Sequence, residues 1–540
     1  MSLRLSYLPA DVFGLSELSR AALAGRPEPP SLPGMRVPAS VEHVPAPPEL
    51  LEPDERAELA ETLEARLSEL GSHVAVLESV RSLAQPGAAC VVAGQQPGFL
   101  GGPLYDLYKA LHAVRLARAL SAAWERPVVP LFWNHADDHD IAEVHHLHVV
   151  NPNLDLRKVA LPGMSSGKRP FSTLVLDAEA HRLEPIGELL RQILPESAHR
   201  EEALERFLPR HGETLARAFT RAYGDLLGPL GLVVLEPDWI RTSLSRALAG
   251  IVGKDPRGPL ERGAEALRAA GHGVAIDPSE AALVFRHVDG KRQALRAGGD
   301  GFRYDDEPGS RSCAELAAEI VQDPADWSPG ALLRPLVQDL ALPVAAYVGG
   351  WGELAYHAEL PPLRAHVGAP ATPFVPRLSA TLLDAETRGS LAKLERTVAE
   401  ALAGAAPEEA EEPEGAPVAA DLRAVAADAA GALLAQQGAL SELDPGLGVQ
   451  LKRTSKQLVD LVDKLAGKAD RVHANRQGKG KRHQRRIESL LLPRELPQER
   501  VLGAVQFTAR FGTDWIAELC GEIDPFPSEH LAVELAAEDA

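Results

Sequence analysis

The sequence predicts an α/β protein whose parallel sheet is interrupted by an insert and is followed by a long helical arm. Two apolar runs, at residues 90–94 and 127–133, flank a segment in which apolar residues recur at helical spacing. A strand, a helix and a second strand in this order indicate a βαβ unit, which requires a parallel sheet. After residue 380 the composition shifts to Ala, Leu, Glu, Lys and Arg, which is typical of long helices.

The composition limits the class of protein. A chain of 540 residues is long enough for a sizeable core and two or more domains. A hydrophobic content of 45% with 24% charged residues is typical of a globular protein, and a net charge of −20 argues against a surface that binds nucleic acid throughout. The three cysteines are far apart, so they predict neither disulfides nor a zinc site.

The sequence carries no pattern that directs it to a membrane. Its first residues lack the basic and apolar segments of a signal peptide. No apolar run reaches the length that spans a bilayer. We therefore predict a cytoplasmic protein with no membrane partner.

The first half of the predicted core covers residues 1–149. It starts with a proline-rich arm at 24–49, and residues 50–83 have helical composition. The strand predicted at 90–94 ends in glycine, and the helix that follows has Pro103 in its first turn, where proline is favoured. The second apolar run then completes the βαβ unit.

An insert follows at residues 150–312 and contributes one strand to the core. The elements predicted within it are short β pieces at 150–185, helices at 186–227, the core strand near 231–238 and β-hairpins at 282–305. The hairpins are indicated by turn residues such as Asp289-Gly290. Helices and strands alternate again at 313–383, which we assign to the second half of the core.

The helical arm is predicted at residues 384–490. Long helices are expected at 380–404, 418–441 and 447–490. The acidic loop at 407–417 is expected to be disordered. Such an arm indicates a helical hairpin or coiled coil, through which we expect a homodimer to form. Residues 491–540 have helical composition and are expected to pack back on the core.

In an open parallel sheet, ligands bind at the carboxyl ends of the strands, so polar turns that follow strands are candidate sites. The first such turn contains Gly94, Gln95, Gln96, Gly98, Gly101 and Gly102. Its glycines would let backbone N–H groups approach an anion, and Lys109 in the next helix would reach back toward it. The alternative is a glycine-rich turn with polar fillers, because the spacing matches neither common phosphate-binding motif. Both interpretations stay open.

The second turn contains Asn134, His135, Asp137, Asp138, His139 and Asp140. Carboxylates and imidazoles directly after an apolar strand would bind a metal, hold a substrate amine or act as acid and base. The alternative is the acidic N-terminus of an ordinary helix. We favour a functional role, because capping a helix does not require two histidines.

The third turn contains Gly349, Gly350, Gly352, Glu353, Tyr356 and His357. Polar residues also lie upstream of it, at Arg334, Gln338 and Asp339, and at the end of the last core strand, at Arg377 and Ser379. Three polar turns at strand ends predict one ligand crevice, on which the side chains of Gln96, His139, Glu353 and Arg377 should converge. Arg377 and Lys109 would supply positive charge there, unless Arg377 only caps the preceding strand or pairs with Glu353.

A basic stretch at residues 468–488 stands out in this acidic chain. It would bind nucleic acid or phosphate, or it would form a solvated or docked face of a helix. Because almost no aromatic residues are interleaved with the basic ones, stacking on bases is not expected. We therefore do not expect a nucleic-acid partner.

Five segments, in the same order, resemble motifs of the bacillithiol biosynthesis cysteine-adding enzyme family. They lie at residues 93–110, 137–140, 334–360, 375–383 and 498–501. Among them are the stretches GQQPGFLGGPLYDLYKA, DDHD and VPRLSATLL. The resemblance covers most of the chain. The sequence departs from the family pattern at Trp351, where proline is usual, and at His357, where tryptophan is usual.

The resemblance implies a Rossmann-type core, similar to class I nucleotidyltransferases and aminoacyl-tRNA synthetases, with connecting-peptide inserts and an α-helical coiled-coil domain used for dimerisation. It also implies a ligase that joins L-cysteine to the amine of glucosaminyl-malate, which forms the thiol bacillithiol. A carboxylate does not acylate an amine unaided at neutral pH, so ATP or an activated cysteine is expected, and nucleotide binding with it. A metal requirement stays open.

On this basis the expected catalytic residues are Asp138, His139 and Asp140. The residues expected to bind substrate or nucleotide are Gly94, Gln95, Gln96, Gly101, Gly102, Tyr105, Lys109, Asn134, Gly349, Gly350, Glu353, Tyr356, Arg377 and Ser379. No metal ligand is assigned. Two other classes stay open. One is a metal-dependent amide hydrolase built on the second turn, and the other is a coiled-coil scaffold or nucleic-acid-binding protein built on residues 380–490.

Overall fold

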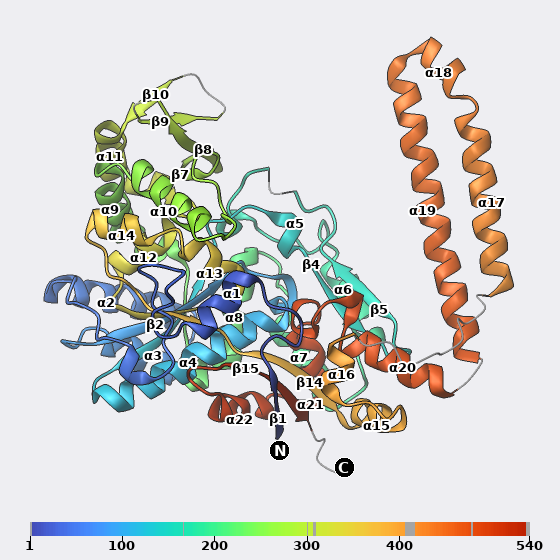
Figure 1. Ribbon diagram of the computed structural model, residues 1–540, viewed down its shortest axis with the longest axis horizontal. Helices are drawn as coiled ribbons and strands as arrows, with labels where there is room; N and C mark the ends of the chain where they lie inside the picture. Colours follow the sequence, from blue (N-terminus) through green and yellow to red (C-terminus); the bar gives the residue numbers. More distant parts are fainter. Residues whose placement is uncertain are drawn as a thin grey trace. The chain divides into compact units, whose positions relative to one another are not determined.

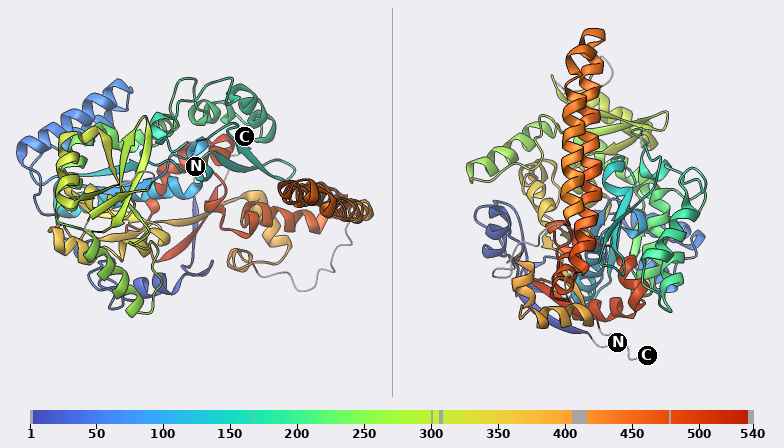
Figure 2. Two further views of the ribbon diagram at one scale, coloured as in Figure 1. Left: turned by 90° about the horizontal axis from the view of Figure 1, so that it is seen from above. Right: turned by 90° about the vertical axis from the view of Figure 1, so that its right-hand side faces the viewer.

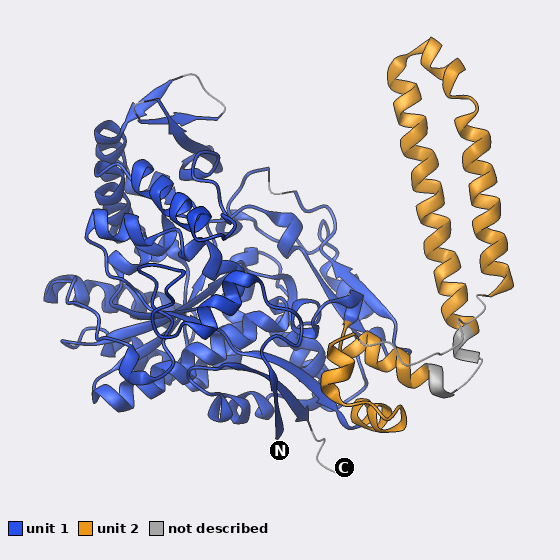
Figure 3. Cartoon of the chain, in the orientation of Figure 1, with its two compact units in different colours: residues 1–385, 493–540 blue, residues 386–492 orange. Residues whose placement is uncertain are grey.

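The computed structural model describes residues 3–165, 167–299, 301–305, 309–404, 416–476 and 479–535. The chain divides into two compact units (Figure 3). The first consists of residues 1–385 and 493–540, and the second of residues 386–492. The second unit is therefore inserted into the first, which the chain leaves and later re-enters.

The core of the first unit is a parallel sheet with the strand order β13-β12-β2-β3-β6. Its strands are β2 (Ala89–Gln95), β3 (Val128–Asn134), β6 (Val233–Leu235), β12 (Val344–Gly349) and β13 (Phe374–Pro376). The core strands predicted at 90–94, 127–133 and near 231–238 are confirmed. The chain first adds β3 and β6 on one side of β2, and later adds β12 and β13 on the other. The order in which strands are added therefore reverses between β2 and β12. In open parallel sheets this switch point is the place where ligands commonly bind.

Helices cover both faces of this sheet (Figures 1 and 2). The helices of the first unit are α1 (Glu17–Ala24), α2 (Pro53–Glu69), α3 (Val74–Ser82), α4 (Leu104–Trp124), α5 (Ile141–Val144), α6 (Leu183–Ile193), α7 (Arg200–Phe207), α8 (Leu215–Leu227), α9 (Arg241–Gly253), α10 (Arg257–Ala269), α11 (Cys313–Gln322), α12 (Arg334–Ala341), α13 (Trp351–His357), α14 (Pro361–Val367), α21 (Ala504–Phe511) and α22 (Asp514–Glu522). On one face α4 packs on the strands, and Phe132 of β3 contacts Phe219 and Tyr223 of α8. On the other face, Cys90 and Leu131 join a core cluster with residues of α2, α3, α9 and α12. Burial on both faces explains why these strands are continuous apolar runs.

The insert forms a separate antiparallel sheet with the strand order β10-β9-β8-β7-β11. Its strands are β7 (Ala282–Val288), β8 (Lys291–Gly298), β9 (Gly301–Tyr304), β10 (Ser310–Ser312) and β11 (Trp327–Pro329). The predicted hairpins are confirmed, since β7 and β8 pair around Asp289 and Gly290, both at positive φ. β4 (His146–Val150) and β5 (Leu156–Ala160) form a smaller hairpin. β5 lies within residues 150–185, where short β pieces were predicted, and β4 begins just before them.

A third sheet joins segments from distant parts of the chain in the order β1-β15-β14. Its strands are β1 (Arg4–Pro9), β14 (Ser379–Asp384) and β15 (Glu529–Leu535). Two expectations are therefore wrong: residues 380–384 do not begin a helix, and residues 491–540 are not helical throughout. Both segments are rich in Ala and Leu, which suit helices, and their extended form comes from long-range pairing such as Leu382 with Val533.

The second unit is helical. Its helices are α15 (Ala385–Lys393), α16 (Val398–Leu402), α17 (Pro417–Leu434), α18 (Gln437–Leu443), α19 (Pro445–Arg476) and α20 (Lys479–Leu490). The predicted helical hairpin is confirmed, because α17 and α19 run side by side (Figures 1 and 2). Arg423 of α17 bridges to Asp463 (2.8 Å) and Asp470 (2.7 Å) of α19. The single helix expected at 447–490 is divided between α19 and α20.

Two predicted features of the arm fall outside the described residues. They are the acidic loop at 407–417, up to residue 415, and the middle of the basic stretch at 468–488. Within the ranges that the structure does describe, no helix is both long and apolar enough to cross a membrane.

Candidate active site

The three polar turns predicted from the sequence begin at the same edge of the parallel sheet. Gln95 at the end of β2 pairs in register with Asn134 at the end of β3. Ala93 of β2 pairs with Val348 of β12, so Gly94 and Gly349 follow at neighbouring strand ends. The turns therefore start around the switch point between β2 and β12, where the topology favours a ligand site.

A buried ion pair joins the first turn to the third. The Lys109 side chain of α4 donates from Nζ to the Gly94 carbonyl oxygen (2.8 Å) and to Gln95 Oε1 (2.7 Å). The same Nζ lies 2.5 Å from Glu353 Oε2. Lys109 therefore holds the end of β2 against the start of α13, across the switch point.

Glu353 is held as a carboxylate by several donors. Besides Lys109, it accepts hydrogen bonds from the Tyr347 hydroxyl (2.6 Å) and from the Gly350 N–H (2.8 Å). Burial alone would raise the pKa of Glu353, but Lys109 and these hydrogen bonds lower it below its ordinary value. Glu353 is therefore ionised at neutral pH, and its negative charge is paired with Lys109.

A second buried ion pair lies at the end of β13. Arg377 Nη2 is 2.6 Å from Glu499 Oε1, and the Ala380 N–H donates to Glu499 Oε2 (3.0 Å). Burial works against both charges, yet the pair raises the pKa of Arg377 and lowers the pKa of Glu499. The alternative in which Arg377 pairs with Glu353 is therefore wrong, since Glu499 takes its charge.

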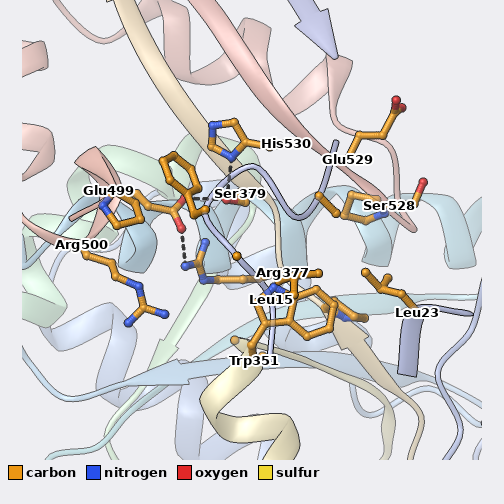
Figure 4. A pocket seen from close by; sticks show the side chains of 18 of the residues that line it. Leu15, Leu23, Trp351, Arg377, Ser379, Glu499, Arg500, Ser528, Glu529 and His530 are labelled. Atoms are coloured by element: carbon orange, nitrogen blue, oxygen red, sulfur yellow. Dashed lines mark hydrogen bonds and ion pairs between the residues drawn. The ribbon is translucent and has the colours of Figure 1, made fainter. Parts of the chain in front are cut away.

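Ser379 and His530 lie beside this pair (Figure 4). The Ser379 hydroxyl is 2.8 Å from His530 Nδ1, and His530 Nε2 is 2.9 Å from the Thr381 hydroxyl. Burial lowers the pKa of His530 to about 4. His530 is therefore neutral at physiological pH, and it links β15 to β14 through two hydroxyl groups.

A cavity of about 260 Å³ opens next to these groups. Figure 4 shows Arg377 pointing toward Glu499, and His530 pointing toward Ser379, on its wall. The residues that line the cavity are Ala10, Phe13, Gly14, Leu15, Leu23, Gly349, Gly350, Trp351, Pro376, Arg377, Ser379, Leu496, Pro497, Glu499, Arg500, Pro527, Ser528, Glu529 and His530. Four predicted site residues, Gly349, Gly350, Arg377 and Ser379, therefore share one cavity large enough for a small molecule.

The second turn forms a different cluster. Gln96 Nε2 donates to Asp138 Oδ2 (2.7 Å), and Arg292 of β8 approaches both Asp138 Oδ1 (3.5 Å) and His139 Nδ1 (3.2 Å). Burial and the charge of Arg292 lower the pKa of His139, so its ring is neutral at pH 7. The cavity beside Arg377 is not lined by Gln96, His139 or Glu353, so it does not gather the four side chains that were predicted to converge.

The charges around the second turn do not suit a metal ion. Both terminal nitrogens of Arg241 bind the Asp137 carboxylate, one of them at 2.9 Å. Burial would raise the pKa of Asp137, but Arg241 lowers it below its ordinary value. The guanidinium groups of Arg241 and Arg292 thus already contact the carboxylates of Asp137 and Asp138 that a metal cation would need. Among the residues described, no three His, Cys, Asp or Glu side chains are arranged to hold a metal.

Two predicted residues of the second turn are held by other contacts. Asn134 is buried, and its side-chain N–H groups donate to the Ala216 carbonyl oxygen (3.0 Å) and to the Thr220 hydroxyl (3.0 Å) of α8. Asp140 is exposed and caps α5 by accepting from the Ala142 N–H (3.2 Å). Asn134 therefore anchors β3 to α8, and Asp140 begins a helix.

The glycines of the first turn are required by packing. Gly101 and Gly102 have positive φ values of 82° and 71°. A Cβ on Gly102 would lie 2.1 Å from Asp106 Oδ2, and the Tyr223 hydroxyl donates to the Gly101 carbonyl oxygen (3.0 Å). The Leu104 N–H at the start of α4 is also satisfied within the protein. These contacts favour the structural interpretation of this turn over an anion site.

Each of the two predicted tyrosines lies near a buried arginine. The Tyr105 hydroxyl accepts from Gln95 Nε2 (3.5 Å), and the Arg377 guanidinium lies 5.6 Å from the centre of its ring. The Tyr356 hydroxyl accepts from Arg334 Nη2 (2.6 Å). Both therefore belong to the polar network beneath the strand ends.

Several residues of the site were not assigned a role from the sequence. Glu499 lies in the last of the five motif segments, so that motif was the available signal. Arg241, Arg292 and His530 come from the insert and the C-terminal strand, and no local pattern marks them. Their roles depend on tertiary pairing alone.

Comparison with known proteins identifies two matching family models. Residues 46–378 match the model described as "Bacillithiol biosynthesis BshC, N-terminal Rossmann-like domain". Residues 380–535 match the model described as "Bacillithiol biosynthesis BshC, C-terminal coiled-coil domain". Together these models span most of the chain.

Curated relatives carry a matching description. A protein of Koribacter versatilis (strain Ellin345) is 30% identical over 499 residues, which cover 90% of this chain and 91% of that protein. A protein of Solibacter usitatus (strain Ellin6076) is 30% identical and covers 83% and 85%. One of Geobacillus thermodenitrificans (strain NG80-2) is 29% identical and covers 89% and 90%. Each is named "Putative cysteine ligase BshC".

Among solved structures, a chain titled as a putative arginyl-tRNA synthetase from Campylobacter jejuni matches with 10% identity. The match covers 86% of this chain and 98% of that chain, with a TM-score of 0.23. A similarity this low carries no argument. The fold rests instead on the parallel sheet and on the two family models.

Proposed function

The chain belongs to the bacillithiol biosynthesis BshC family, and from this premise we propose that it is a ligase that joins the carboxyl group of L-cysteine to the amine of glucosaminyl-malate. The product would be bacillithiol, and the bond formed would be an amide. The single observation that carries the proposal is the meeting of the family's motif turns around one switch point. There Lys109 pairs with Glu353, and Arg377 lines a cavity of about 260 Å³.

The reaction needs an activated carboxyl group. ATP, or a cysteine activated beforehand, would supply the leaving group, because an ionised carboxylate is a poor acyl donor. The amine nitrogen would then attack the carbonyl carbon, lose a proton and expel the leaving group. The protein has to hold the amine neutral and close to the carbonyl group.

Asp138 and His139 are the proposed acid–base residues of this step. Asp138 already accepts a hydrogen bond from Gln96 and lies beside Arg292, so its carboxylate is oriented before a substrate arrives. His139 is neutral at pH 7 and is only half-buried, so its ring is able to accept a proton from an amine. Asp140 caps α5, so in this proposal it contributes indirectly, by fixing the start of that helix.

The proposal is tested by product formation. Purified protein is incubated with L-cysteine, glucosaminyl-malate and ATP, and bacillithiol is measured by mass spectrometry with and without the nucleotide. We expect Asp138→Asn to form product at least about tenfold more slowly, since a hydrogen bond to a charged group contributes roughly 1.5–3 kcal/mol. The control is Asp225→Asn, which removes an exposed carboxylate of α8. Product formation by Asp138→Asn at the wild-type rate would remove this cluster from the mechanism.

The homodimer is proposed on the basis of the second unit. Apolar side chains of α17 and α19 are exposed in the single chain, among them Val425 (65%), Leu461 (68%) and Leu465 (54%). Apolar residues on a long helical hairpin are typical of helices that pack on another copy. Each copy would then contribute its own site in the first unit.

A further inference from the structure

Arg334, the first residue of α12, carries a buried charge with no acidic partner. Its Nη2 donates to the Tyr356 hydroxyl (2.6 Å), whereas its Nη1 is buried and has no hydrogen-bond partner. Among the described residues, no carboxylate forms an ion pair with it. Glu353 is near enough to act on its pKa, but that carboxylate lies 2.5 Å from Lys109.

Two other buried arginines of the first unit, Arg377 and Arg364, differ in this respect. Arg377 pairs with Glu499 at 2.6 Å, and Arg364 pairs with Asp339 at 2.6 Å. Burying a charge without a partner is costly, so folded proteins rarely leave one unless a ligand completes it. Burial would lower the pKa of Arg334, but Tyr356, Tyr347 and Glu353 raise it above the ordinary value. Arg334 therefore stays protonated, and its charge is not balanced by a partner of its own.

His135, at the end of β3, presents a second unsatisfied group. Its Nε2 is buried without a hydrogen-bond partner and lies 2.9 Å from the position that a Cβ on Gly94 would occupy. Burial, followed by the charges of Arg334 and Lys109, lowers the pKa of His135 well below its ordinary value. The ring is therefore neutral, and as the Nε2–H tautomer it would donate a hydrogen bond.

We propose that Arg334 and His135 form a subsite that binds one carboxylate group of a substrate. Arg334 is the first residue of α12, and His135 directly follows β3 at the carboxyl edge of the sheet. Both flank the Lys109–Glu353 pair: His135 Nε2 lies against Gly94, whose carbonyl oxygen accepts from Lys109, and Tyr356, which accepts from Arg334, lies on the same helix as Glu353. One uncompensated guanidinium matches a single negative charge, and its free N–H together with a neutral imidazole matches the two oxygens of a carboxylate. The identity of the acid rests on the proposed function, under which it is either L-cysteine or the malate group of glucosaminyl-malate.

The first test measures the stability of the free protein. Arg334→Gln removes a charge that lacks an acidic partner, so we expect its melting temperature to equal or exceed that of the wild type. Arg364→Gln is the matched control, because it leaves Asp339 buried without its cation, and we expect a lower melting temperature. If Arg334→Gln destabilised the free protein as much as Arg364→Gln does, the charge would be structural and the proposal would fail.

The second test measures binding by calorimetry, without turnover. L-Cysteine is compared with cysteamine, which lacks the carboxylate, and glucosaminyl-malate is compared with glucosamine. We expect Arg334→Gln to weaken one of the two acids at least about tenfold, and to leave its carboxylate-free analogue and the other substrate unchanged. The acid that is affected identifies the group in the subsite. Wild-type affinity for both acids would overturn the proposal.

A third arm separates the subsite from the proposed function. Malonate, a simple dicarboxylate, is added to the wild type and to Arg334→Gln, and the melting temperature is measured. Stabilisation of the wild type alone would support the subsite even if neither cysteine nor glucosaminyl-malate bound, in which case only the proposed function would fail. Equal stabilisation of both proteins, or of neither, would count against Arg334 as the carboxylate ligand.

Discussion

At the scale of single residues, the Arg377–Glu499 pair makes stability depend on pH. Burial would raise the pKa of Glu499, but Arg377 lowers it below the ordinary 4.5. A carboxyl group with a lowered pKa in the folded state adds stability that is complete above its unfolded pKa. That stability is lost as the pH falls through the folded pKa, because the group then binds a proton. The pair therefore contributes to the free energy of unfolding at neutral pH, and this contribution is lost in acid.

We expect Glu499→Gln to lower the free energy of unfolding at pH 7 by about 3–5 kcal/mol, since Arg377 stays buried without its partner. The difference from the wild type should be constant down to about pH 5 and should shrink below about pH 4.5. Urea denaturation at a series of pH values measures both. Glu69→Gln, which breaks an exposed pair with Arg66, is the control and should change stability by less than about 1 kcal/mol. A difference that did not depend on pH would contradict the prediction.

The sequence predicted some site residues and missed others for a physical reason. Lys109 and Glu353 follow glycine turns at strand ends, so a local pattern places them at the edge of the sheet. Asn134 occupies an equivalent position, yet its side chain turns into the core toward Thr220, which alternation along a strand does not reveal. In the sequence Arg334 is only a polar residue upstream of the third turn, because its lack of an acidic partner is visible only in three dimensions.

At the scale of elements, the turn between β2 and α4 depends on Gly102. Its φ of 71° is unfavourable for other residues, and a side chain there would meet the Asp106 carboxylate. We expect Gly102→Ala to lower the free energy of unfolding by more than about 2 kcal/mol. Gly224→Ala in α8 is the control, because its Cβ meets no atom within 4 Å, and it should stabilise by about 0.5–1 kcal/mol. Thermal denaturation compares the two, and an unaffected Gly102→Ala would show that the turn adapts.

The strands of the parallel sheet were predictable, and those of the third sheet were not. β2 and β3 are buried on both faces and appear as apolar runs bounded by turn residues. β14 and β15 contain residues that also suit helices, and each is extended because the other lies beside it. Local composition cannot contain that information, because the partners are far apart in the chain.

At the scale of the whole molecule, the second unit governs the expected dimer. Leu461 and Leu465 lie one turn apart on α19 and are 68% and 54% exposed. We expect the double variant Leu461→Glu and Leu465→Glu to be monomeric in light scattering, because charges replace an apolar stripe. The control is Lys456→Glu, which alters charge on another part of α19 and should leave the dimer intact. A wild-type protein that is itself monomeric would rule out this arrangement.

The pairing of β1 with β15 also sets an order of events in the cell. A ribosome releases residues 4–9 early and residues 529–535 late, yet these segments are neighbours in the folded protein. Until residues 529–535 have been synthesised, β1 has no β15 to pair with. Glu499 and His530, which line the cavity beside Arg377, also arrive at the end. A nascent chain halted at residue 492 would contain every strand of the parallel sheet and still lack the residues between Leu496 and His530 that line its pocket.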